Sequence, residues 1–137
     1  MKKKLAVGVI CKDNIYELRR TLLSISAQTE NAHEVIIVDG SKTPINKKSS
    51  DIEYIIKQLK DKKVSINYLI QKGDGIASAF NYVYQNSSSK YLLYLNSGDE
   101  FFSTDTIKNI LPFLKENKSL YCFASLVCNP LKNSIKL

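Results

Sequence analysis

Short continuous runs of apolar residues alternate with amphipathic segments along most of this chain of 137 residues. The runs at 5–11 and 35–38 contain no charged residue and do not alternate between apolar and polar positions. A strand that is covered on both faces has this pattern, whereas a strand with one face in water alternates. We therefore expect both runs to be central strands of a sheet with helices on both sides.

The amphipathic segments have helical spacing. In each, apolar residues recur at intervals of three or four and would lie along one side of a helix. Asn14 stands where it can cap the first helix, and Ser50 where it can cap the second. The apolar stripes are Ile15, Leu18, Leu22 and Ile25; Ile52, Ile55, Ile56 and Leu59; Ile76, Ala79, Phe80 and Val83; and Ile107, Ile110, Leu111 and Leu114.

The last helix is expected to start at Thr104 or Ser103. Pro112 lies inside it and should kink or split it, because proline lacks an amide hydrogen and crowds the preceding turn. A final strand is predicted at 120–127, and the tail at 129–137 shows no clear pattern.

Two further strands are predicted at 64–70 and 91–95, the first nearer the sheet edge because it partly alternates. Strands and helices in alternation indicate an α/β fold: a three-layer α/β/α sandwich with a mainly parallel sheet. We expect one domain that spans 1–137.

Composition excludes several classes of protein. No apolar stretch approaches the roughly 18 residues of a membrane span, and no cleavage site follows the lysines at 2–4 as in a signal peptide. Three cysteines without C-x-x-C spacing argue against a disulfide framework or a zinc site, so we expect a cytoplasmic location. The net charge of +7 comes from scattered lysines, which is not a nucleic-acid-binding pattern. Such a charge suits a solvated surface or peripheral contact with the anionic inner face of a membrane.

Polar or glycine-containing sequence follows each of the first four predicted strands, at 11–14, 39–41, 71–75 and 96–99. In parallel sheets, ligands bind outside the carboxyl ends of the strands, so these segments should converge. Carboxylates and glycines together suit a nucleotide diphosphate with Mg²⁺ or Mn²⁺. The fingerprints of dinucleotide-binding oxidoreductases and P-loop NTPases are missing.

Four blocks of sequence resemble, in order and spacing, the family 2 glycosyltransferases of GT-A fold. The first combines 7–14 with 18–25 and Gln28-Thr29; the others are 34–41, 74–81 and 91–101. The last block has the N-S-G-D form of bacterial polysaccharide-assembly enzymes. The resemblance implies a nucleotide-diphospho-sugar transferase that moves a sugar to a glycan or lipid-linked acceptor.

The resemblance also implies roles for individual residues. Asp39 would contact the base or ribose, and the segment that contains Cys11 and Asp13 would line the base pocket. Asp74 would orient the donor, and Asp99 would hold Mn²⁺ or Mg²⁺ against the diphosphate, where the cation stabilises the departing nucleotide.

Alternatives remain open for several of these positions. Asp74 is equally suited to capping the third helix, and Cys11 to plain packing. Asn81 suits donor binding and backbone hydrogen bonding equally well, and Asn96 belongs to the turn that carries Asp99.

Relatives of this kind continue into an acceptor-binding half that contains the catalytic base, so the resemblance implies a truncated GT-A domain. No residue here matches the base motif, and an exposed apolar face would favour a homodimer. The competing hypotheses are a nucleotide-sugar-binding module without transfer activity and a flavodoxin-like signalling domain with Asp39 as its acceptor carboxylate.

Overall fold

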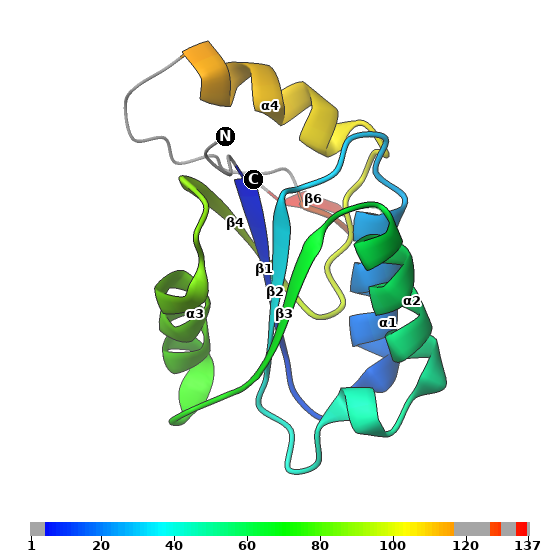
Figure 1. Cartoon of the computed structure of the whole chain (residues 1–137), viewed down its shortest axis with the longest axis vertical. Coiled ribbons are helices and arrows are strands. Elements are labelled where there is room, and N and C mark those ends of the chain that lie inside the picture. Colours follow the sequence, from blue (N-terminus) through cyan, green and yellow to red (C-terminus); the bar gives the residue numbers. More distant parts are fainter. Residues whose placement is uncertain (1–4, 117–126, 130–133, 137) are drawn as a thin grey trace.

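A parallel sheet forms the centre of the molecule. The computed structural model describes residues 5–116, 127–129 and 134–136 (Figure 1). Within these residues, four parallel strands lie in the order β3-β2-β1-β4. The strands are β1 (Leu5–Cys11), β2 (Glu34–Asp39), β3 (Ser65–Ile70) and β4 (Tyr91–Asn96). The two continuous apolar runs are the central strands, and the partly alternating segment is the edge strand β3, as predicted.

Helices cover both faces of this sheet, which confirms the three layers. Helices α1 (Ile15–Ser26) and α2 (Ser50–Asp61) lie on one face and α3 (Gly75–Asn86) on the other (Figure 1). The fourth helix, α4 (Thr106–Glu116), contributes Ile107 and Leu114 to the core on the α1 side. A smaller core joins Ala79 and Val83 of α3 to the opposite faces of β1 and β2.

Helix α3 approaches β1 at a glycine. A Cβ at Gly8 would lie 2.4 Å from Cγ1 of Val83, closer than packed atoms come. The absence of a side chain at Gly8 therefore sets how closely α3 lies on the sheet.

The predicted cap of α1 is confirmed and that of α2 is wrong by one residue. The Asn14 side chain accepts a hydrogen bond from the Glu17 amide. At α2, Ser49 has extended backbone and its hydroxyl accepts from the Ile52 amide. Ser50 is already helical, so it cannot fill the cap position.

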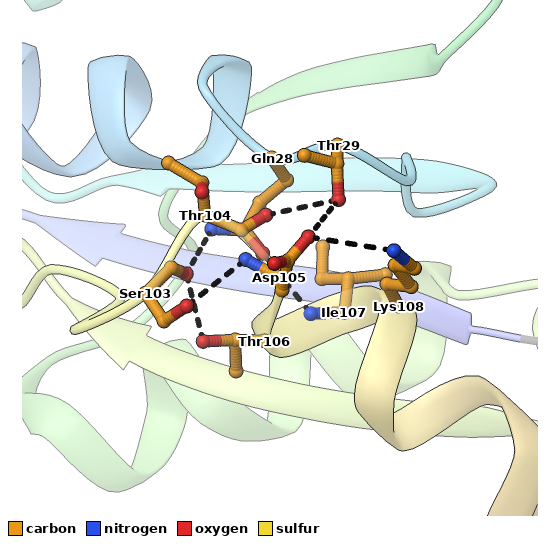
Figure 2. A network of polar contacts seen from close by, with 8 residues as sticks. All are labelled: Gln28, Thr29, Ser103, Thr104, Asp105, Thr106, Ile107 and Lys108. Atoms are coloured by element: carbon orange, nitrogen blue, oxygen red, sulfur yellow. Dashed lines mark hydrogen bonds and ion pairs between the residues drawn. The ribbon is translucent and has the colours of Figure 1, made fainter.

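Two predictions about α4 are corrected. The helix begins at Thr106 rather than at Ser103 or Thr104, because the Ser103 hydroxyl and carbonyl close a turn on Asp105 and Thr106 (Figure 2). The helix also runs through Pro112, so the alternative that this proline splits the helix is wrong, while the alternative of a kink stays a prediction.

Ile76 does not face the core as the apolar stripe of α3 predicts, since 60% of this residue is exposed.

Within the described residues, no helix is long and apolar enough to cross a bilayer.

The predicted strand at 120–127 lies outside the described residues except at its last position. There, β5 (Val127–Asn129) pairs antiparallel with β6 (Ser134–Lys136), so the expectation of a tail without pattern is wrong.

Candidate functional site

The carboxyl ends of all four parallel strands border one cavity of about 430 Å³. Strand register accounts for this: Cys11 lies opposite Asp39, and Ile10 opposite Asn96. The first turn of α3 closes another side of the cavity. The convergence of strand ends expected from the sequence is therefore present.

Four of the predicted site residues line this cavity: Cys11, Asp39, Asp74 and Asn96. Asp99 adjoins them, because its Oδ2 accepts hydrogen bonds from the backbone amide of Asn96 at 3.1 Å and from its Nδ2 at 3.3 Å. The carboxylates of Asp39 and Asp99 thus belong to one edge of the sheet.

The other two predicted residues do not line the cavity. The Asp13 amide donates to the Ser41 hydroxyl at 2.7 Å, which ties the loop after β1 to the loop after β2. Asn81 is exposed on α3.

Asp39 is completely buried and accepts hydrogen bonds from three groups of the protein. Oδ1 accepts from the Ser41 amide at 2.9 Å, and Oδ2 accepts from the Ile45 amide at 2.7 Å and the Tyr68 hydroxyl at 2.6 Å. Burial alone raises the pKa of this carboxyl, but hydrogen bonds from Ser41, Tyr68 and Ile45 outweigh it and hold the pKa below its ordinary value. Asp39 is therefore ionised at neutral pH and organises the loop on its side of the cavity.

Cys11 lies beside this carboxylate as a neutral thiol. Burial raises its pKa, and the negative charge of Asp39 raises it further. The Sγ atom lies 3.7 Å from the Val38 carbonyl oxygen, to which it donates weakly. The arrangement suits packing against a ligand rather than nucleophilic chemistry.

The amino end of α3 opens toward the cavity. Asp74 occupies the cap position with extended backbone, but within the described residues its side chain makes no capping hydrogen bond. The capping alternative for this side chain is therefore wrong. Gly73 and Gly75 on either side have φ of 82° and 83°, a conformation that favours glycine. Amide groups at a helix start suit an anion such as a phosphate.

Polar residues that the sequence did not single out individually also line the cavity: Lys12, Ser41, Gln71 and Ser97. Lys12, which lies in the segment expected to line the base pocket, brings a positive charge. The Gln71 Nε2 donates to the Gly75 carbonyl at 2.9 Å and so joins β3 to the start of α3. All four residues stand in the segments that follow strands, and that position was the available signal.

Asp99 sits at the end of a tight turn. Its amide donates to the Asn96 carbonyl at 3.0 Å, and Gly98 has φ of 95°, as the third residue of a type II turn requires. The neighbouring Glu100 forms an ion pair with Arg20.

Among the described residues there is no cluster of three or more His, Cys, Asp or Glu side chains that could enclose a metal. One exposed carboxylate suits a Mg²⁺-like ion that takes its other ligands from phosphate oxygens and water.

Lowering the pH should destabilise the fold, because two carboxylates that accept hydrogen bonds in the folded chain become protonated. At the far end of β2, burial raises the pKa of Glu34, but bonds from Ser87, Ser88 and Ser89 outweigh it and lower the pKa. The pKa of Asp39 is lowered in the same way. A lowered folded-state pKa adds stability that is complete above the unfolded value, about 4, and is lost as pH falls through the folded value. We expect the free energy of unfolding in urea to fall from pH 6 to pH 3.

Replacing Glu34 by glutamine should remove part of this pH dependence, whereas Glu30→Gln on the exposed loop should not. A free energy of unfolding that stays constant down to pH 3 would contradict the expectation.

Comparison with known proteins agrees with this geometry. Residues 6–137 match the model of "Glycosyl transferase family 2". An uncharacterized glycosyltransferase of Rickettsia bellii is 33% identical over 106 residues, which are 77% of this chain and 14% of the relative. One of Rickettsia conorii is 30% identical over 122 residues, 89% of this chain and 19% of the relative. The chain thus spans less than a fifth of the length of these relatives.

Solved structures share the fold. S. aureus TarS superposes with a TM-score of 0.65 at 19% identity over 82% of this chain and 32% of that one. TarS has also been solved in complex with UDP. The mannosyltransferase PcManGT of Pyrobaculum calidifontis, in complex with GDP-Man and Mn²⁺, gives a TM-score of 0.65 at 17% identity over the same shares. With a four-stranded parallel sheet of GT-A type and a family match over nearly its whole length, the chain belongs to glycosyl transferase family 2.

Proposed function

We propose that this chain binds the nucleotide-diphosphate sugar for a glycosyl transfer to a glycan or lipid-linked acceptor, in the assembly of a cell-surface polysaccharide. The observation that carries the proposal is the convergence of four strand ends and the Asp99 turn at one cavity. A cytoplasmic location, with contact at the inner face of the membrane, belongs to the same proposal, as does a homodimer.

Each side of the cavity suits one part of such a donor. Asp39 would contact a base or ribose through the loop that it holds in place, because its buried carboxylate accepts three hydrogen bonds from the protein. Cys11 would pack against the base. The amino end of α3 and Lys12 would bind the diphosphate. Asp74, near the diphosphate, would help to orient the donor.

Asp99 would hold Mn²⁺ or Mg²⁺ on the diphosphate. The cation supplies charge neutralisation as the nucleoside diphosphate leaves the sugar. The turn from Asn96 to Asp99 presents the carboxylate beside the cavity and keeps it exposed.

A second candidate function is donor binding without transfer. Transfer needs a carboxylate that removes the proton of the acceptor hydroxyl. Glu100 pairs with Arg20, and Asp105 accepts from the Thr29 hydroxyl and lies 3.9 Å from the Lys108 ammonium. Their engagement favours a base that is supplied from outside the described residues.

Calorimetric titration with UDP-, GDP- and dTDP-sugars, each with Mn²⁺ and with EDTA, tests the proposal. We expect one nucleotide to bind, and to bind more tightly with Mn²⁺. Release of free sugar from the bound donor would favour an enzyme over a binding module. If none of the three nucleotides binds, the proposed function is wrong.

A further inference from the structure

Helix α1 and the residues just after it carry a line of polar residues on a buried to half-buried face. Glu17, Thr21 and Ser24 are spaced by four and three residues, which places them on one side of the helix, and Gln28 follows four residues later, just beyond the helix end. Thr21 is completely buried and Gln28 is 5% exposed. A buried polar side chain is costly unless it is hydrogen-bonded, so the partners of this line are informative.

All four residues bond to the chain segment 96–107. The Glu17 carbonyl accepts from the Gly98 amide at 3.2 Å, and the Ser24 hydroxyl accepts from the Phe101 amide at 3.3 Å. Gln28 donates to the Ser103 carbonyl at 2.8 Å and accepts from the Ile107 amide at 3.0 Å, at the start of α4. Figure 2 shows this end of the contact, where Thr29 also bonds to Thr104 and Asp105.

Thr21 holds the part of the segment that contains Asp99. Its hydroxyl accepts from the Gly98 amide at 2.9 Å and donates to the Asp99 carbonyl at 2.8 Å. One buried oxygen therefore bonds the backbone on both sides of the pair Gly98-Asp99. The turn is also held by the Asp99 amide on the Asn96 carbonyl at 3.0 Å and by the Gly98 amide on the Glu17 carbonyl at 3.2 Å.

We propose that Thr21 is a positioning residue, whose hydroxyl aims the Asp99 carboxylate at the cation on a bound diphosphate. This inference rests on the proposed function. Without the hydroxyl, the Asp99 carbonyl would lose its donor and the Gly98 amide would keep only the longer bond to Glu17. The turn could then adopt other orientations, and the carboxylate would spend less time beside the cavity. Removing a group that orients a metal ligand typically costs about 10- to 100-fold in metal affinity.

The test compares Thr21→Val with Thr21→Ser and Thr29→Val in the full chain. Valine keeps the shape of threonine and removes the hydroxyl, and serine restores the hydroxyl. Thr29→Val makes the same chemical change at an exposed residue that bonds to Asp105, away from the Asp99 turn. The measurements are the apparent affinity for Mn²⁺ in saturating UDP or GDP, followed by the electron paramagnetic resonance of free Mn²⁺, and the hydrogen exchange rate of the Gly98 amide.

We expect Thr21→Val to weaken Mn²⁺ binding about tenfold or more and to speed Gly98 exchange, while nucleotide affinity in EDTA stays unchanged. Thr21→Ser should recover most of the Mn²⁺ affinity, and Thr29→Val should behave as the unaltered chain. Mn²⁺ affinity that is unchanged in Thr21→Val would overturn the proposal.

If Thr21→Val does not fold, the unaltered chain still decides, because a Gly98 amide that exchanges as fast as a free peptide overturns the proposal. Failure of the proposed function looks different: the unaltered chain then binds none of the UDP, GDP and dTDP nucleotides.

Discussion

Asp99→Asn should weaken the Mn²⁺-dependent binding of a nucleoside diphosphate by about 100-fold. The substitution removes the charge that would hold the cation, but an amide oxygen can still accept from the Asn96 amide, so the turn itself should persist. Calorimetric titration of UDP and GDP with Mn²⁺ and with EDTA measures the effect. The loss should be confined to the titrations with Mn²⁺, because the substitution leaves the rest of the cavity unchanged.

Asp105→Asn is the matched control. Asp105 is another aspartate on the same connecting segment, but it bonds to Thr29 and does not line the cavity. Equal Mn²⁺ dependence in Asp99→Asn and in the unaltered chain would show that Asp99 does not hold the cation.

Asp39→Ala should destabilise the fold by about 3 kcal/mol, because three donors, two of them buried, lose their acceptor at once. For a chain of this length, the midpoint of thermal unfolding should fall by about 10 °C. Urea unfolding, followed by circular dichroism, measures the free energy. Asp61→Ala, at an exposed aspartate at the end of α2, should change it little.

Tyr68→Phe separates the structural role of Asp39 from its contact with a ligand. It removes one donor to Asp39 from a side chain that does not line the cavity. We expect a cost of about 1 kcal/mol with nucleotide binding unchanged. If Asp39→Ala unfolds with the same free energy as the unaltered chain, the three hydrogen bonds do not support the fold as argued.

Several features of the fold were predictable because they depend on local pattern. A strand that is apolar on both faces must be covered on both faces, which placed β1 and β2 in the centre of the sheet. Polar residues directly after parallel strands meet at one edge in any such sheet, so Cys11, Asp39 and Asn96 were expected to converge. Their contact around one cavity follows from register alone.

Other features depend on where elements lie in space. Ile76 belongs to the apolar stripe of α3, but it sits in the first turn at the mouth of the cavity, where it is exposed. The bonds to Asp39 could not be foreseen, since Tyr68 lies 29 residues away on the neighbouring strand. Two adjacent serines, Ser49 and Ser50, suit a helix cap equally, and backbone conformation chose between them. Thr21 is an ordinary helix residue by sequence, and its role depends on Gly98 and Asp99, which lie 77 and 78 residues further along the chain.

Close packing at a glycine beneath the cavity limits how the selectivity of the cavity could be altered by directed evolution. Gly8 has no room for a methyl group, because a Cβ there would lie 2.4 Å from Cγ1 of Val83 in the core, so mutant libraries that vary Gly8 would mostly yield misfolded variants. At Gly40 a Cβ would lie 2.5 Å from Oε1 of Gln71, the end of a flexible side chain that can move aside. Lys12, Ile70 and Ile76 line the same cavity with exposed side chains, so diversity introduced there would reach the ligand while the scaffold stays intact.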